Sequence, residues 1–179
     1  MYAGGVQQTI VSFEEPSAGA SQVTLVSATN GYAPALDGKY AALLQGGVTS
    51  AGASITQTAQ IPSGMETLLF EAQFEGGQII PGLLEVSIDG QGLAFSAIGT
   101  EPNYTLHGAD IESWAGDTVT LAFTAPGADY ALNSWVVDDI SFSPNSVVPE
   151  PNSLVLMAVG GIVFAAYRRL RNRCMQEPV

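Results

Sequence analysis

The chain has 179 residues, with 17 acidic and five basic side chains and a formal net charge of −12. Residues 1–148 hold fifteen of the acidic side chains against Lys39 alone, whereas the other four basic residues are arginines within residues 168–173. This distribution excludes nucleic-acid binding, because nothing outside the C-terminal end can neutralise phosphates, and it favours an acidic, soluble domain tethered at its C-terminus.

The first ten residues, MYAGGVQQTI, show neither the basic n-region nor the apolar h-region of a secretory signal peptide. An exported protein needs such a leader, so we expect the leader to have been removed or to be missing, with Ala3 as a remnant. Processing and a misassigned start both fit this expectation.

Residues 6–143 alternate between apolar and polar side chains in several short runs. The clearest runs cover residues 68–74, 84–88 and 119–123. A period of two predicts half-buried β-strands, and turn-forming pairs separate the runs. These pairs include Asp37-Gly38, Asp89-Gly90 and Pro126-Gly127. We expect nine or ten short strands and no helix before Asn152, arranged as an antiparallel β-sandwich that forms one domain over residues 1–145.

Three stretches of this domain carry a resemblance: IVSFEEP near its start, ADIESWAGDTVTLAFTAPG late in it, and NSWVVDDISFSP at its end. Together they resemble the jelly-roll, galactose-binding-like modules shared by carbohydrate-binding and MAM-like adhesion domains. The resemblance covers nearly the whole domain and implies an all-β jelly roll. Its motifs are short and identify no ligand.

The same resemblance implies a structural Ca²⁺ where the first and last strands adjoin, with Glu14 and Asp138 as ligands and Asp139 as a weaker candidate. On an unbroken last strand four residues share one face: Val136, Asp138, Ile140 and Phe142. A carboxylate among apolar neighbours is costly to bury unless it is paired or binds a metal, and Ca²⁺ is bound by oxygen ligands. Two alternatives remain open: a bulge that turns Asp138 outward, and backbone N–H groups that satisfy it.

Catalytic residue types are sparse. His107 is the only histidine, so at most one relay of the Ser-His-Asp kind is available, and no Gly-x-Ser-x-Gly elbow flanks any serine. We expect His107, in NYTLHGAD, to lie at a strand end or turn with a solvated imidazole. The chain lacks the His and Cys cluster that zinc needs, and some carboxylate pairs are inevitable among so many acids. We therefore predict that the protein is not an enzyme.

Trp114 and Trp135 are the candidates for stacking on sugar rings, with Tyr104 and Tyr130 behind them. Trp114 stands beside Gly116 at a predicted turn, and Trp135 opens the predicted last strand. The alternative for each tryptophan is burial in the core or packing under a loop.

The C-terminal end has three consecutive parts. Residues 146–151 form a linker that contains Pro149, Glu150 and Pro151; residues 152–167 are uncharged and apolar; and residues 168–179 begin with four arginines. Those arginines are Arg168, Arg169, Arg171 and Arg173. At about 1.5 Å per residue the apolar run reaches about 24 Å as a helix, a short membrane span whose arginines would face the cytoplasm and leave the acidic domain outside. The alternative is a buried C-terminal helix, which an all-round apolar surface disfavours.

This order of parts resembles the PEP-CTERM sorting signal of bacterial envelope proteins, although Cys174 to Val179 extend past the arginines, where such signals usually stop. The resemblance implies an exosortase-like processing enzyme as a partner, acting on the Pro-Glu-Pro region, and either a single-pass membrane protein or a processed surface or extracellular one. We predict a non-catalytic envelope or extracellular-matrix component that binds polysaccharide. The alternative is a secreted glycan-acting enzyme fragment or an accessory carbohydrate-binding module.

Overall fold

The computed structural model describes residues 11–17, 19–47, 52–76, 83–127 and 133–147. This part of the chain is all-β and holds eleven strands and one short 3₁₀ helix, η1. In chain order the elements are β1 (Val11–Phe13), β2 (Gln22–Ser27), β3 (Tyr40–Gln45), β4 (Ala53–Gln60), β5 (Thr67–Phe74), β6 (Glu85–Ile88), β7 (Gln91–Gly92), β8 (Ser96–Thr100), β9 (Thr105–Asp110), η1 (Glu112–Trp114), β10 (Thr118–Ala125) and β11 (Ser134–Ser143).

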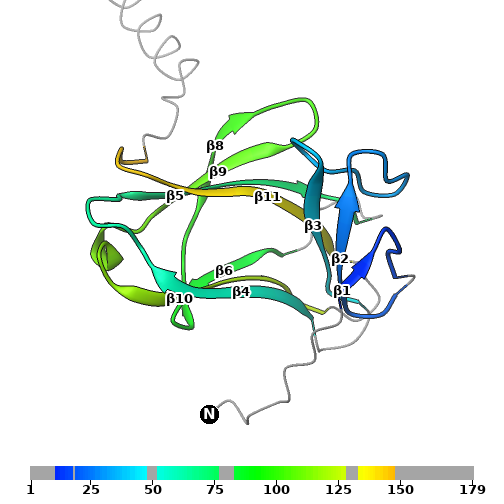
Figure 1. Ribbon diagram of the computed structural model, residues 1–179, viewed down its shortest axis with the longest axis horizontal. Helices are drawn as coiled ribbons and strands as arrows, with labels where there is room; N and C mark the ends of the chain where they lie inside the picture. The colour runs from blue at the N-terminus through cyan, green and yellow to red at the C-terminus, as the bar shows by residue number, and fades with distance from the viewer. Residues whose placement is uncertain (1–10, 18, 48–51, 77–82, 128–132, 148–179) are drawn as a thin grey trace, which may run out of the picture. The chain divides into compact units, whose positions relative to one another are not determined.

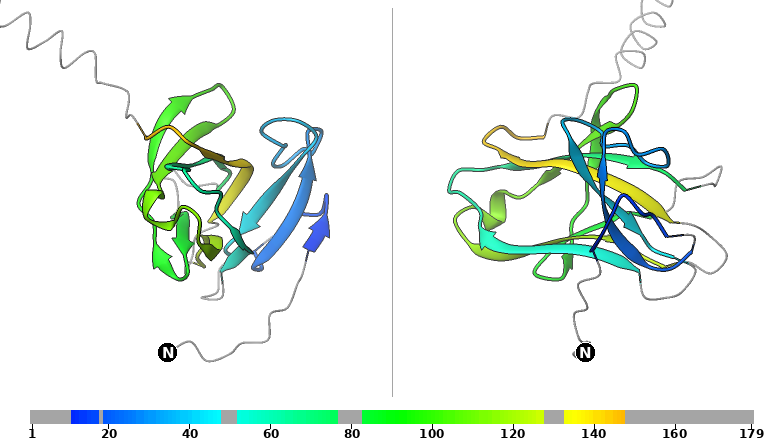
Figure 2. Two further views of the ribbon diagram at one scale, coloured as in Figure 1. Left: turned by 60° about the vertical axis from the view of Figure 1, so that its left-hand side comes forward. Right: turned by 45° about the vertical axis from the view of Figure 1, so that its right-hand side comes forward.

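The strands form two sheets that face each other as the layers of a β-sandwich. The larger sheet has the order β1-β2-β3-β11-β5-β9-β8 and the smaller has the order β4-β10-β6-β7. Figure 1 shows β5, β9 and β11 in one layer and β4, β6 and β10 in the other, and Figure 2 shows β1, β2 and β3 standing at one side. The predicted antiparallel arrangement is correct for all pairs except one, because β1 runs parallel to β2, with Val11 opposite Val23.

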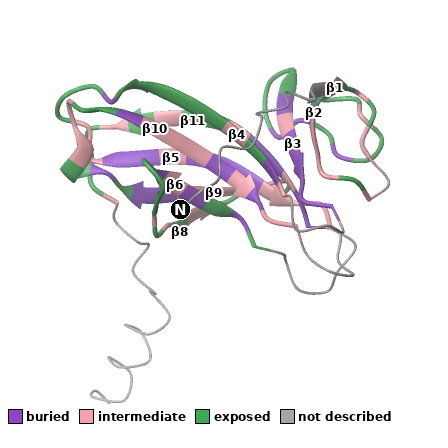
Figure 3. Ribbon diagram, turned by 90° about the horizontal axis from the view of Figure 1, so that it is seen from below, coloured by how far each residue is buried: buried purple, intermediate pink, exposed green. Residues whose placement is uncertain are grey.

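The main core lies between the two sheets and is built from the alternating residues that the sequence singled out. Leu68, Phe70 and Ala72 on β5 are buried there, as are Val86 and Ile88 on β6. Figure 3 shows β5 as largely buried and β4 as largely exposed. The strand prediction for these runs is therefore confirmed.

A second, smaller core lies on the other face of the larger sheet. The segment between β2 and β3 folds over this face and buries Ala33, Ala35 and Leu36 against Val26 and Val136. The outer face of the larger sheet is thus partly covered near β3 and β11, and Glu71 on that face is buried although it is charged.

The Asp89-Gly90 pair forms the expected turn, since it joins β6 and β7 as a two-residue hairpin loop in which Ile88 is paired with Gln91. Both turn residues have positive φ, 49° for Asp89 and 78° for Gly90. This is the backbone geometry of the type I′ turn, which Asp-Gly pairs favour.

A β-bulge in β11 overturns the expectation that Val136, Asp138, Ile140 and Phe142 share one face. Asp138 is opposite Glu71 on β5, but the next paired residue, Ser141, is opposite Leu69, so one extra residue is inserted between them. Asp139 lies in this insertion with a φ of 40°. The bulge reverses the alternation, so the last two apolar residues of that set point between the sheets while Val136 packs in the second core.

His107 also differs from its expectation, because it lies inside β9 rather than in a solvated turn. Its ring stacks on Phe70 at a centroid distance of 5.2 Å and meets Phe95 edge-on at 5.2 Å. Its Nδ1 atom is buried without a hydrogen-bond partner, and burial lowers the pKa of the imidazole. His107 is a packing residue of the main core.

The chain divides into two compact units, Met1–Val147 and Val148–Val179. The second unit lies outside the described residues, together with the predicted Pro-Glu-Pro motif, the predicted span and its arginines. Among the residues that the structure describes, none of the helices is long and apolar enough to cross a membrane.

Candidate functional site

An acidic cluster occupies the outer face of the larger sheet beside the second core. Glu71 on β5 is the cross-strand partner of Asp138 on β11, and the charges of Asp37, Asp138 and Asp139 all act on the Glu71 carboxyl. We call these four residues the acidic corner. The backbone N–H of Asp37 donates to Asp138 Oδ2 at 3.3 Å, and the backbone N–H of Asp139 donates to Asp138 Oδ1 at 2.9 Å.

Glu71 is the unusual member of the acidic corner, because its side chain is only 5% exposed and its Oε2 atom is buried without a hydrogen-bond partner. The hydroxyl of Tyr104 donates to this carboxyl. Burial raises the pKa of Glu71, and the neighbouring aspartates raise it further. The same hydrogen bond raises the pKa of Tyr104, since ionisation of the phenol would abolish it.

Because ionising the buried Glu71 carboxyl costs free energy, we expect the stability of the domain to depend on pH. Because its folded-state pKa is raised, the stability that Glu71 contributes is present at low pH and is lost as pH rises through the folded-state pKa. Glu71→Gln is expected to stabilise the domain by about 1 kcal/mol at pH 7 and to be neutral near pH 4, because the amide carries no charge to bury. Urea titrations at the two pH values measure the free energy of unfolding of the wild type and of Glu71→Gln. The exposed Glu101→Gln is the matched control. Equal stabilisation by Glu71→Gln at both pH values would contradict the prediction.

The residues predicted as calcium ligands do not all meet. Glu14 lies just after β1 with a φ of 60°; its carboxylate accepts hydrogen bonds from the Ser27 backbone N–H and from Asn30 Nδ2, the latter at 2.9 Å. The bond from Asn30, with the smaller contribution of Ser27, lowers the pKa of Glu14. Asp138 and Asp139 belong to the acidic corner instead. Within the described ranges, no group of three or more His, Cys, Asp or Glu side chains is placed to hold a metal ion.

Trp114 lines an open surface depression of about 300 Å³, at the lower end of the range of about 300–1,000 Å³ typical of small-ligand sites. The depression also contains Asp110, Glu112 and Ser113, with Leu93 at its apolar side. The local chain positions these groups through η1: Asp110 Oδ1 accepts the Glu112 backbone N–H at 3.0 Å, and the Trp114 backbone N–H donates to the Ile111 carbonyl at 2.9 Å. A half-buried indole beside two carboxylates and a hydroxyl offers both an apolar face and hydrogen-bonding groups.

Trp135 has a different environment. Both tryptophans are half-buried against the main core, but the ring of Trp135 also lies 5.4 Å from that of Phe74, and its Nε1 donates to Asn133 Oδ1 at 3.1 Å. Tyr104, the hydroxyl partner of Glu71, packs on the second core. Tyr130 lies outside the described residues. Of the two tryptophans, Trp114 is the one that the structure places on a surface depression.

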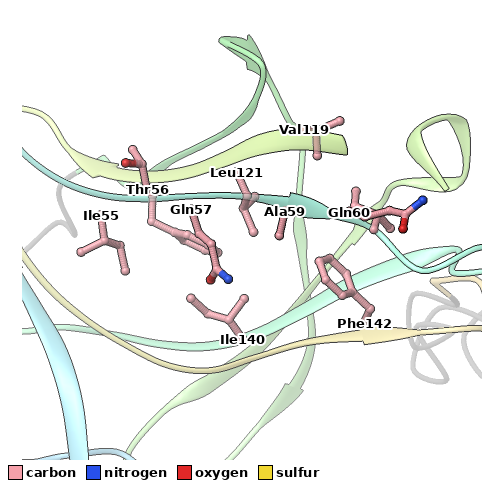
Figure 4. A pocket seen from close by; sticks show the side chains of 11 residues that line it. Ile55, Thr56, Gln57, Ala59, Gln60, Val119, Leu121, Ile140 and Phe142 are labelled. Atoms are coloured by element: carbon pink, nitrogen blue, oxygen red, sulfur yellow. The ribbon is translucent and has the colours of Figure 1, made fainter. Parts of the chain in front are cut away.

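A separate groove of about 230 Å³ lies between β4 and the end of β11. Its lining is mostly apolar and includes Ile55, Ala59 and Leu121 from the smaller sheet and Ile140 and Phe142 from β11. Figure 4 shows Gln57 and Ile140 on opposite sides of this groove. Ile140 and Phe142 are 41% and 36% exposed, so the bulge in β11 leaves two large apolar side chains open to solvent.

Sequence reasoning missed Glu71 and Asp37 as members of one cluster with Asp138. The alternation of β5 does place Glu71 on the face opposite Phe70. What the sequence lacks is a local sign that the segment between β2 and β3 covers that face, since this depends on contacts distant in the chain.

Comparison with known proteins identifies the C-terminal end. Residues 147–171 match the family model of the PEP-CTERM protein-sorting motif, a range that includes Glu150 and extends to Arg171. The predicted sorting motif is therefore confirmed. It indicates an exported protein sorted to the cell envelope or surface, and it implies membrane association and processing by an exosortase-like enzyme. No curated protein and no solved structure matches the chain significantly.

Proposed function

We propose that the protein is a non-catalytic component of the cell envelope or extracellular matrix whose β-sandwich binds polysaccharide at the Trp114 depression. The sorting motif supports display at the surface. The observation that carries the binding proposal is the grouping of Trp114 with Asp110, Glu112 and Ser113 in one open depression. An aromatic ring can stack on the apolar face of a pyranose while carboxylates and a hydroxyl bind its hydroxyl groups.

Charge narrows the class of polysaccharide. The chain has a formal net charge of −12 and the depression itself contains two acidic side chains. A polyanionic glycan would be repelled by both, because like charges disfavour association. The proposal is therefore for a neutral or amino-sugar-containing polysaccharide.

Binding assays on the detergent-solubilised full chain test this proposal. Trp114→Ala is expected to weaken binding to a neutral polysaccharide at least tenfold, about 1.4 kcal/mol, because it removes the stacking surface. Tyr40→Ala is the control, since Tyr40 is an aromatic residue on β3 that is 52% exposed and is absent from the depression. Unchanged affinity in Trp114→Ala would contradict the assignment of the site.

The non-catalytic part of the proposal is tested with the same polysaccharides. Release of reducing ends by the wild-type chain that disappears in Glu112→Gln would instead support the alternative of a glycan-acting enzyme. Glycoside hydrolysis uses two carboxyl groups that flank the scissile bond, and Asp110 and Glu112 are the pair that the depression offers. We expect no release.

We further propose that Ca²⁺ stabilises the acidic corner. The buried, unpartnered Glu71 Oε2 beside Asp37, Asp138 and Asp139 supports a cation there, since a divalent ion would offset the repulsion among these carboxylates. The side chains would have to converge further to coordinate it, because within the described residues no group of three is already so placed. Glu14 takes no part in this version of the site.

Thermal melting with Ca²⁺ and with chelator tests the calcium proposal. Ca²⁺ at 100-fold above its dissociation constant is expected to stabilise the chain by about 2.7 kcal/mol, which raises the melting temperature by several degrees. Asp138→Asn should abolish this increase, whereas Asp117→Asn, an exposed position before β10, should retain it. Identical melting curves in Ca²⁺ and in chelator would rule the ion out.

A further inference from the structure

We propose that β4 is a self-association edge, along which two copies of the chain pair antiparallel to form one continuous sheet. The smaller sheet has the order β4-β10-β6-β7, so β4 is bonded to β10 on one side and has no hydrogen-bonded strand on the other among the described residues. Figure 3 shows β4 exposed along most of its length at this edge. The inference concerns assembly and goes beyond the proposed binding function.

The four edge strands of the two sheets differ in how well they are protected. β1 has three residues, β7 has two, and β8 has five with a register shift between Ala97 and Gly99. β4 has eight residues, and its pairing with β10 is unbroken from Ala53 to Gln60. Short edges and bulges are devices that prevent edge pairing, and β4 has neither.

The backbone groups that point out of this edge follow from the alternation of an antiparallel ladder. The Ile61 N–H donates to the Asp117 carbonyl at 2.9 Å, so the odd-numbered residues of β4 direct their N–H and C=O groups toward β10. The even-numbered residues direct theirs away from it. These are Ser54, Thr56, Thr58 and Gln60. Four residues thus present donors and acceptors in the spacing that a further antiparallel strand requires.

Charge favours a second copy at this position. The chain has a formal net charge of −12, but no charged residue occurs between Lys39 and Glu66. The neighbouring strand, Thr118–Ala125, is uncharged as well. Two copies that repel each other over most of their surfaces therefore meet no carboxylate along the edge strands themselves.

In the proposed dimer, the paired β4 strands lie beside the apolar groove and extend its apolar surface. With Gln57 opposite Gln57 of the second copy, the even-numbered residues form the hydrogen-bonded pairs, and Ile55 of each copy lies opposite Ala59 of the other. These side chains are on the face of β4 that lines the groove. An added strand therefore extends the apolar layer at the open side of the sandwich, where Ile140 and Phe142 are partly exposed.

A second copy fits this edge better than an unrelated peptide because the antiparallel pairing is symmetric, so each contact is made twice. Surface sorting adds to this, since molecules carrying the motif are delivered to one membrane and their local concentration is raised.

Disulfide trapping tests the register. Gln57→Cys in a Cys174→Ser background places the only thiol of each full-length chain at a non-hydrogen-bonded pair, where Cα atoms lie about 4.5 Å apart, within disulfide range. Mild oxidation in detergent is expected to link most chains into dimers. Gln91→Cys in the same background, exposed on β7 at the other edge of this sheet, should stay mostly monomeric. Equal dimer formation by both variants would overturn the proposal.

Size measurement by light scattering in detergent tests the edge without cross-links. Thr56→Pro removes a backbone donor from the free edge and leaves the bonds to β10 in place, so it should convert the dimer to monomer with a native melting transition. Thr56→Lys, which keeps the N–H and adds a charge to each edge, should do the same if the proline variant fails to fold. A monomeric wild-type chain, or a dimer that persists in a folded Thr56 variant, would overturn the proposal.

Discussion

Phe70→Ala is expected to destabilise the domain by about 3–5 kcal/mol, a large part of the total stability of a typical domain. Phe70 on β5 is fully buried. Its ring centroid lies 5.2 Å from that of Phe95, 5.0 Å from that of Phe123 and 5.2 Å from that of His107. Alanine would leave a cavity among three rings from different strands and loops, which rigid sheets cannot close.

Urea denaturation of the full chain in detergent measures this loss. Phe13→Ala is the matched control, since Phe13 on β1 is 57% exposed and its truncation should change the stability by about 0.5 kcal/mol or less. A loss below about 1.5 kcal/mol for Phe70→Ala would show that the main core repacks around the missing ring.

The strands were predictable because their signal is local. Alternation in residues 68–74 and 119–123 is visible within one strand, and the structure uses it directly, with Phe70 and Phe123 packed edge to face at 5.0 Å in the main core. The Asp89-Gly90 turn is predictable for the same reason, since its backbone preference is a property of the two residues.

The bulge in β11 could not be predicted, and it changes which face of the sheet the last side chains of this strand point to. Nothing in VVDDISFS marks where the register slips, because the slip depends on how β11 pairs with β5. Asp138 lies before the slip, in regular register beside Glu71 on the outer face, whereas Ile140 and Phe142 lie after it and turn inward to the groove. A regular alternation would put all three on one face, so the apolar groove beside Ile140 and Phe142 does not follow from the sequence.

The candidate site was predictable only in part, for a similar reason. Residue type and a position near Gly116 single out Trp114 in the sequence, and Trp114 does line a surface depression. Its partner Asp110 comes from the end of β9 and Leu93 from the segment after β7, so their convergence on η1 depends on tertiary packing. The parallel pairing of β1 with β2 is likewise set by contacts outside the three residues of β1.

Glu150→Ala is expected to block maturation of the exported chain almost completely and to leave its membrane association intact. Glu150 is the acidic residue of the matched sorting motif, between Pro149 and Pro151. Because proline disfavours helix both at its own position and at the one before it, the sequence predicts an extended strip there that a protease-like cleft can bind. The glutamate supplies the one charge in that strip, whereas the apolar residues and arginines that are predicted to associate with the membrane are unchanged.

Membrane fractionation and intact mass spectrometry, in a bacterial host that has an exosortase-like enzyme, distinguish the unprocessed from the mature chain. Glu177→Ala is the matched control, because it removes the same charge outside residues 147–171 and should mature normally. If Glu150→Ala matured at the wild-type rate, recognition would have to depend on the prolines or the arginines alone. Loss of both maturation and membrane association would instead assign Glu150 to an earlier step, since a failure of processing alone leaves the chain at the membrane.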